Sequence, residues 1–235
     1  MNIFEKIKEF LFRNNKTQLI EEKKEKIEKT YEDELYEQYG RCRDIKKYNL
    51  KILFITDTHN CLTYDKECIE YIKNAKDYCI LLGDHSAEDL YEITQIIPKD
   101  KICGVLGNHD SWDKYKEYGI NNIDGKTIEI KGTKIAGISG SFKYKNTDQY
   151  VLYTHEESIE IADKMEKADI LVSHDKPFTK DLHDNAHDGL KGITKYLYKN
   201  QVPLHIHGHL HEESEEYLKN GTKTICLFKA KIVEI

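Results

Sequence analysis

The segment KILFITDTHN, residues 51–60, joins an apolar run directly to a polar one. The run from Ile52 to Ile55 is uninterrupted, which is typical of a strand buried on both faces of a sheet. It ends just before Asp57 and His59, two residues that can bind a metal ion. Because ligands of open α/β sheets bind at the carboxyl ends of the strands, the segment predicts a sheet edge that carries a ligand site.

Strands and helices alternate along the chain beyond this segment. Further apolar runs predict strands at 78–82, 101–106, 169–173 and 202–207, and the stretch 126–140 is rich in β-formers. Helical patterns cover 65–75, 86–97 and 189–200, and another helix opens at Thr154, where Glu157 completes a possible capping box. Asn220-Gly221 is a hairpin signal. The alternation predicts a layered α/β domain.

Residues 1–48 differ in composition from the rest of the chain. They contain no histidine and are dense in Lys and Glu. One apolar stripe runs from Phe4 to Leu11 and another from Leu19 to Leu35, and Gly40 could end the second helix. We therefore expect a charged helical extension over 1–48, packed on the main domain 49–235 or on a second copy. A recruitment arm or a membrane-surface helix is the alternative.

Composition limits the class of partner. The net charge of −6 argues against a broad basic surface, so no stable nucleic-acid complex is expected. No apolar run reaches the length of a membrane span, and the first residues lack a secretory pattern. No membrane contact and a cytoplasmic location are therefore expected. The six cysteines form no Cys-x-x-Cys pair and read as buried free thiols.

Five predicted strands end in residues that can bind metal. All eleven histidines lie after residue 50, and several of them stand where a strand gives way to a loop. The five strand ends read TDTHN, LLGDH, LGNHD, VSHD and HGHLH. Any one of these motifs is weak evidence, but the five together at one sheet edge indicate a metal site.

In this order, DTH, GD, GNHD, SHD and GHLH resemble the motifs of the calcineurin-like metallophosphoesterase superfamily, over roughly residues 51–235. The resemblance implies a four-layer αββα sandwich around a two-metal site that hydrolyses phosphate esters. Since the chain has no room for long insertions, it looks most like the small single-domain bacterial and phage-type members. The protein is thus expected to be a metal-dependent phosphoesterase.

The resemblance also implies which residues bind metal. Asp57, His59 and His211 would hold the first ion, with Asp84 bridging to the second. Asn108, His174 and His209 would complete the second site.

This mixed nitrogen and oxygen set suits transition metals better than Mg²⁺. We expect two divalent ions per chain, with Mn first and Fe, Ni or Zn as alternatives. His109 would stay off the metals as the catalytic imidazole, which could protonate the leaving group or stabilise its developing charge, and Asp110 could orient its ring.

Other residues near the motifs have more ordinary interpretations. His205 and His207 alternate with apolar residues along a strand, so packing or hydrogen bonding outside the ligand set is expected. His85 reads as a loop imidazole that could instead reach the substrate, and Trp112 as a packing residue that could instead stack on a nucleobase. The segment 181–192 is either a solvated loop or a phosphate contact before a helix.

The predicted function is binuclear-metal hydrolysis of small phosphate esters, most of all phosphodiesters on nucleotide-type substrates. A phosphomonoesterase or a nuclease on short ends would use the same site. A catalytically silent scaffold, as in the superfamily's retromer subunit, is the alternative from another class. Self-association through the N-terminal helices is the expected partner interaction besides the substrate.

Overall fold

The computed structural model describes residues 30–62, 66–74, 78–179 and 185–235. The chain divides into two compact units, Met1–Glu34 and Leu35–Ile235. The predicted apolar stripe from Phe4 to Leu11 lies outside the described residues. Helix α2, Tyr31–Tyr39, ends before Gly40, as predicted, and Gly40 has the left-handed φ of +69° that often follows a helix.

The first sheet of the larger unit has five strands in the order β13-β1-β2-β3-β4. Strands β1, β2, β3 and β4 are mutually parallel, and β13 pairs antiparallel with β1. The bounds are Lys51–Thr56 for β1, Tyr78–Leu81 for β2, Ile102–Gly104 for β3, Asn121–Asn122 for β4 and Lys229–Glu234 for β13.

The second sheet has six strands in the order β11-β12-β10-β9-β6-β5. Its centre is parallel, and the predicted hairpin at Asn220-Gly221 joins β11 to β12 at one edge. The bounds are Thr127–Ile130 for β5, Thr133–Ile138 for β6, Ile170–Ser173 for β9, Leu204–His207 for β10, Ser214–Tyr217 for β11 and Lys223–Cys226 for β12. A separate parallel pair consists of β7, Ser141–Phe142, and β8, Leu152–Tyr153.

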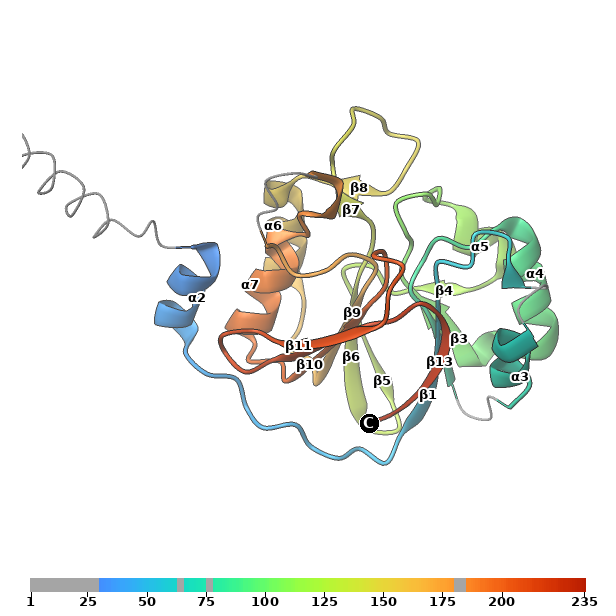
Figure 1. Cartoon of the computed structure of the whole chain (residues 1–235), viewed down its shortest axis with the longest axis horizontal. Helices are drawn as coiled ribbons and strands as arrows, with labels where there is room; N and C mark the ends of the chain where they lie inside the picture. The colour runs from blue at the N-terminus through green and yellow to red at the C-terminus, as the bar shows by residue number, and fades with distance from the viewer. Residues whose placement is uncertain (1–29, 63–65, 75–77, 180–184) are drawn as a thin grey trace, which may run out of the picture. The chain divides into compact units, whose positions relative to one another are not determined.

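The two sheets face each other across one apolar core. Phe54 and Ile80 of the first sheet belong to the same buried cluster as Val172 and Ile206 of the second. Helices α3 (Lys66–Asn74), α4 (Ala87–Ile96) and α5 (Lys114–Tyr118) lie outside the first sheet, and α6 (His155–Lys164) and α7 (Lys191–Lys199) outside the second (Figure 1). The short helices η2 and η3 cover Lys99–Lys101 and Asn185–His187. The predicted αββα sandwich is confirmed.

Local predictions on the helices are also confirmed. Thr154 caps α6, and its hydroxyl accepts from Glu157 N while the Glu157 carboxylate accepts from Thr154 N. In the described part of the chain, no helix is long and apolar enough to cross a membrane.

The segment between α2 and β1 lies along the larger unit. Cys42 N donates to Asn220 O at 2.8 Å, and the Arg43 guanidinium pairs with Asp169 at 2.9 Å. Tyr48 N donates to Ile235 O at 3.0 Å. Residues 42–48 thus make ordered contacts with the domain. The predicted domain boundary between residues 48 and 49 stays a prediction.

Candidate metal centre

All of the predicted metal and catalytic residues lie just beyond the carboxyl ends of five strands. The first sheet supplies those that follow β1, β2 and β3, and the second sheet supplies those that follow β9 and β10. Because the two sheets face each other, their parallel strands bring these loops to one edge of the sandwich. The expected gathering is what the structure shows, and two groups of side chains could each hold a metal ion: Asp57, His59 and His211, and Asp57, Asp84 and His174.

In the first group, two imidazoles converge on one carboxylate oxygen. His211 Nε2 lies 3.3 Å from Asp57 Oδ1, His59 Nε2 lies 3.8 Å from it, and the two Nε2 atoms are 3.1 Å apart. Asp57 Oδ1 is buried and has no hydrogen-bond partner among the described residues, whereas Oδ2 accepts from Thr56 Oγ1 and His209 N. A buried carboxylate oxygen without a donor is costly unless a cation serves it, so the residues present fit a metal ion.

In the second group, Asp84 faces imidazoles from both groups. Asp84 Oδ2 lies 3.5 Å from His174 Nε2 and 4.0 Å from His59 Nε2. His174 Nε2 is also 2.8 Å from Asn108 Oδ1, and the rings of His174 and His209 are 4.9 Å apart. A carboxylate can bind two cations at once. Asp57 belongs to both groups, and Asp84 Oδ2 faces one imidazole of each group.

Backbone carbonyls fix which nitrogen of two histidines is available to a metal. A carbonyl can only accept, so His174 donates from Nδ1 to Leu82 O at 2.7 Å, which leaves Nε2 as the ligand atom. His209 donates from Nε2 to Ala186 O at 3.2 Å, which leaves Nδ1. The sequence does not signal this use of Ala186, because a backbone carbonyl leaves no trace in the residue type.

Burial and charge set the protonation of these rings. Burial lowers the pKa of His209 to about 3, so this imidazole is in the neutral form that binds metal. Burial also acts to lower the pKa of His174, but the Asp84 and Asp57 carboxylates outweigh it and the pKa is raised. For Asp57, burial acts to raise the pKa, and His174 together with the accepted hydrogen bonds lowers it overall. A metal ion would therefore compete with a proton on His174.

The site is built on unusual backbone geometry. Five of the seven predicted ligands have a left-handed φ, a region that Asp and His tolerate better than most residues: Asp57, His59, Asp84, His209 and His211. The motif glycines are required by close approach. A Cβ at Gly107 would lie 2.1 Å from Asp84 Oδ1, and one at Gly208 would lie 2.0 Å from Thr56 Oγ1.

His109 and Asp110 are neighbours in the chain but face different surroundings. The His109 side chain is exposed, its ring packs edge-on to that of His59, and its backbone N donates to Asp84 Oδ1 at 2.8 Å. Asp110 is buried and accepts from Asp84 N and Gly107 N, and it pairs with Lys114. Asp110 therefore holds the loop of Asp84, and in the described structure its oxygens are occupied by these partners rather than by the His109 ring.

The remaining histidines of the strand β10 are buried, as the packing interpretation requires. His205 Nε2 lies 2.6 Å from Ser173 Oγ, and the rings of His205 and His207 stack with centroids 5.0 Å apart. His85, expected as a loop imidazole, is only 1 % exposed, and its Nδ1 lies 2.9 Å from Thr58 Oγ1. His85 thus lies in the loop between β2 and α4, as expected, and its side chain is buried there.

Two other predictions concern Trp112 and the segment 181–192. Trp112 is 44 % exposed and touches Tyr153 edge-on, so packing accounts for only part of its ring. In the segment 181–192, residues 181–184 lie outside the described residues. The ring of His187 is 5.0 Å from that of His209, which places the described end of this segment beside the candidate centre.

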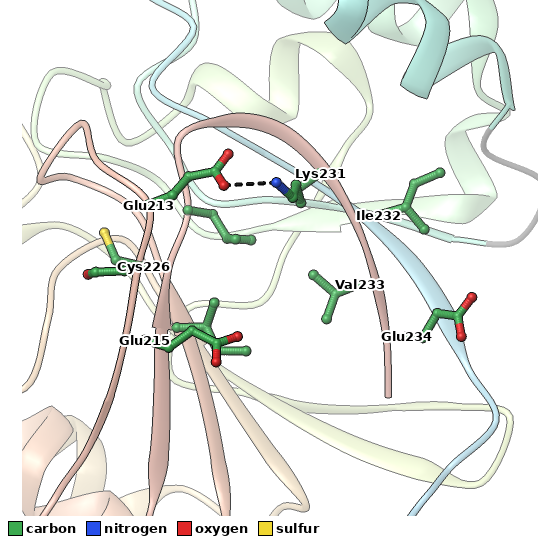
Figure 2. Close-up of a pocket in the computed structure, with 10 residues that line it drawn as sticks. Glu213, Glu215, Cys226, Lys231, Ile232, Val233 and Glu234 are labelled. Carbon is green, nitrogen blue, oxygen red and sulfur yellow. Dashed lines mark hydrogen bonds and ion pairs between the residues drawn. The ribbon is translucent and has the colours of Figure 1, made fainter.

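A groove of about 460 Å³ lies elsewhere, between β11–β12 and β13 (Figure 2). Its lining residues do not include the predicted site residues. Its acidic groups are paired with lysines: Glu213 with Lys231, Glu215 with Lys223 and Glu234 with Lys51. Each glutamate that lines the groove is therefore paired with a lysine, and its negative charge is compensated and would not select a cationic ligand.

The comparison with protein families agrees with the geometry of the site. Residues 50–227 match the calcineurin-like phosphoesterase superfamily domain. The chain belongs to this superfamily. The superfamily uses divalent metal ions, and the Asp and His groups described above are the residues that could bind them here.

Individual relatives are distant. An uncharacterized protein of Haemophilus influenzae is 26% identical over 200 residues, which cover 68% of this chain and 83% of that protein. Among solved structures, the protein TT1561 of Thermus thermophilus has a TM-score of 0.51 at 14% identity, with 78% of this chain and 98% of that one covered.

Two named hydrolases are similar to the same degree. The phosphopantetheinyl hydrolase of Mycobacterium tuberculosis has a TM-score of 0.52 at 12% identity, over 76% of this chain and 89% of that chain. A 5'-nucleotidase of Candida albicans has a TM-score of 0.52 at 13% identity, over 80% of this chain and 47% of that chain. At such identities the likeness shows the fold alone.

Proposed function

We propose that this protein hydrolyses small phosphodiesters, including nucleotide-type substrates, at a centre of two divalent transition-metal ions. The observation that carries the proposal is the position of Asp84. Its Oδ2 faces His59 of one group and His174 of the other, while Asp57 Oδ1 is buried and has no donor within the described chain. Such an arrangement is suited to two cations that share a carboxylate.

The ligand set divides between the two ions as follows. Asp57, His59 and His211 would hold the first, and Asn108, His174 and His209 the second, with Asp84 shared. When bound, the two ions would polarise the phosphoryl oxygens and lower the pKa of a water molecule. Imidazole nitrogens and an amide oxygen bring no negative charge as ligands, which limits the negative charge where a phosphate must dock. The mixed nitrogen and oxygen donors suit transition metals better than Mg²⁺, and we propose Mn first, with Fe, Ni or Zn as alternatives.

His109 is the proposed general acid. Its ring is exposed and contacts His59, so a bound ester could reach it, and its amide is tied to Asp84. It would hold a proton for the leaving-group oxygen. Asp110 would support this role indirectly, because it fixes the backbone of Asp84, which in turn holds the amide of His109.

Aromatic side chains beside His109 support a substrate that carries a planar group, such as a nucleobase or an aryl ring, on its phosphate ester. The ring of Tyr150 packs edge-on to His109 at 6.3 Å, and Lys145 Nζ lies 4.1 Å above the Tyr150 ring. Trp112 adds an exposed ring on the same loop as His109. Rings of this kind can stack on a nucleobase or an aryl group. A phosphomonoester with the same planar group would fit equally, and this is the alternative activity.

A substrate panel tests the proposal. Metal-free protein would be supplied separately with Mn²⁺, Ni²⁺, Zn²⁺ or Mg²⁺ and assayed on bis(p-nitrophenyl) phosphate, p-nitrophenyl phosphate, a cyclic nucleotide and a short single-stranded DNA. We expect transition metals to restore hydrolysis of the diester, and Asp84→Asn to remove it. Absence of hydrolysis with every metal, although metal is bound, would favour the scaffold alternative.

A further inference from the structure

One buried carboxylate outside the predicted ligand set contacts two of the loops that carry ligands. Asp89 is the third residue of α4, is 1 % exposed and forms a capping box with Ser86. Beyond this box, its oxygens accept from Thr58 Oγ1 at 2.6 Å, Asn60 N at 2.8 Å and Leu62 N at 3.2 Å. Together with Ser86 N at 3.4 Å, four donors converge on a single side chain.

These donors flank His59. Thr58 and Asn60 are its two neighbours in the chain, and both are bonded to Asp89. His59 itself has a φ of +43°, a conformation that must be held by its surroundings. Since a histidine ring swings with its backbone, the carboxylate fixes the direction from which the imidazole enters the candidate centre.

The same carboxylate also reaches the loop of Asp84. The Thr58 hydroxyl has one proton, which it donates to Asp89, so it must accept from His85 Nδ1. His85 directly follows Asp84, and His59 N donates to Asp84 O at 3.2 Å. These bonds join the loop after β1 to the loop after β2, and Asp89 accepts hydrogen bonds from both loops, from Thr58 and Asn60 of the first and from Ser86 of the second.

We propose that Asp89 is a positioning residue for the metal centre, which holds His59 and Asp84 in place for the first ion. This inference rests on the proposed function, because it assigns Asp89 a purpose that only a metal site requires. The alternative is that Asp89 serves the helix alone, as an ordinary capping residue.

The chain contains a matched control for capping. Glu157 is the corresponding acid of the box on α6, and its carboxylate accepts from Thr154 N at 2.8 Å. An amide oxygen can replace this acceptor, so Glu157→Gln should change little. Asp89→Asn cannot satisfy donors on both oxygens, because one of them becomes an NH₂ group that itself donates.

The experiment compares Mn²⁺ binding by calorimetry for the wild type, Asp89→Asn and Glu157→Gln, each as the folded, metal-free full chain. We expect Asp89→Asn to weaken Mn²⁺ binding at the site of the first ion by about 10–100-fold. This is the usual range when a residue that hydrogen-bonds and orients a metal ligand is lost. Glu157→Gln should bind as the wild type does. Hydrogen exchange of residues 57–62 should accelerate in Asp89→Asn alone.

Thr58→Val provides a milder variant if Asp89→Asn does not fold. It removes one donor and the link to His85, and it should weaken the same binding event by less. Wild-type affinity in a folded Asp89→Asn, or in Thr58→Val if that is the one that folds, would overturn the positioning role. A wild-type chain that binds no metal would instead refute the proposed function.

Discussion

The increase in Tm on metal binding tests which carboxylate is shared by the two ions. If Asp84 bridges two ions, then Asp84→Asn should remove the stabilisation due to both of them. His59→Ala touches only the first group and His174→Ala only the second, so each should remove the part due to one ion. The three variants therefore differ in how much of the metal-induced shift in Tm they lose.

The size of the shift follows from mass action. An ion at 100 times its Kd stabilises the folded state by about 2.7 kcal/mol. For a domain of this size, 1 kcal/mol shifts Tm by about 2–4 °C, so one ion should add about 5–10 °C. Two ions together should add about 10–20 °C, because two independent terms double the free energy. The wild type should show the full shift, and each histidine variant about half of it.

Differential scanning fluorimetry of metal-free protein, with and without Mn²⁺, measures these shifts. Retention of half of the shift or more by Asp84→Asn would refute the bridge. If Asp57→Asn is the variant that cancels the shift completely, then Asp57, which belongs to both groups, is the shared ligand. If His59→Ala loses the whole metal-induced shift in Tm, then the two ions bind only together. Lys51→Gln, on the exposed pair with Glu234, is a control that should keep the whole shift.

Further outcomes can be checked in the same protein. His109→Ala should keep both metals and lose about 10²–10⁴-fold in kcat, and the loss should shrink for good leaving groups in a steady-state assay; equal losses would exclude it as the acid. A chain beginning at Leu35 should fold and remain active, whereas one beginning at Lys47 should show a lower Tm at unchanged activity per folded molecule, because it lacks the contacts of residues 42 and 43. Tyr150→Ala should raise KM for a nucleotide ester more than for methyl p-nitrophenyl phosphate, and equal changes would exclude stacking. Burial acts to raise the pKa of Asp169, but the hydrogen bonds that this carboxylate accepts lower its pKa overall. Asp169 therefore contributes to stability above about pH 4, and the contribution is lost as the pH falls through the folded pKa. Acid unfolding of Asp169→Asn should lack this component.

The strands and the layout of the site could be predicted because their signals are local. Apolar runs marked β1 and β9, and metal-binding residues marked the ends of those strands. A parallel sheet then brings such ends to one edge without further information. The hairpin at Asn220 and the cap at Thr154 were equally local, since each is written in a few consecutive residues.

Contacts between loops could not be predicted in this way. Adjacency in the chain suggests that Asp110 orients the His109 ring, but its carboxylate accepts from Asp84 N. His85 lies in a loop, as its sequence context predicts, but its burial and its contact with Thr58 do not follow from that context. Asp89 was missed although Ser86-x-x-Asp89 is itself a capping pattern. Its partners lie about thirty residues away, where no local pattern points.

The predicted metal ligands adopt backbone conformations that need continuous support. A non-glycine residue in a sparsely populated region of φ and ψ costs about 1–3 kcal/mol, although Asp and His lie at the lower end for left-handed backbone. Such a conformation persists only if neighbouring bonds fix it. Asp57 Oδ2 holds His209 N, Asp84 Oδ1 holds His109 N and Asp89 holds the loop of His59. Each support comes from a carboxylate that accepts from a backbone N–H, and Asp57 and Asp89 also accept from the hydroxyls of Thr56 and Thr58. These hydrogen bonds would therefore help to hold the predicted ligands in the orientation that a metal ion requires.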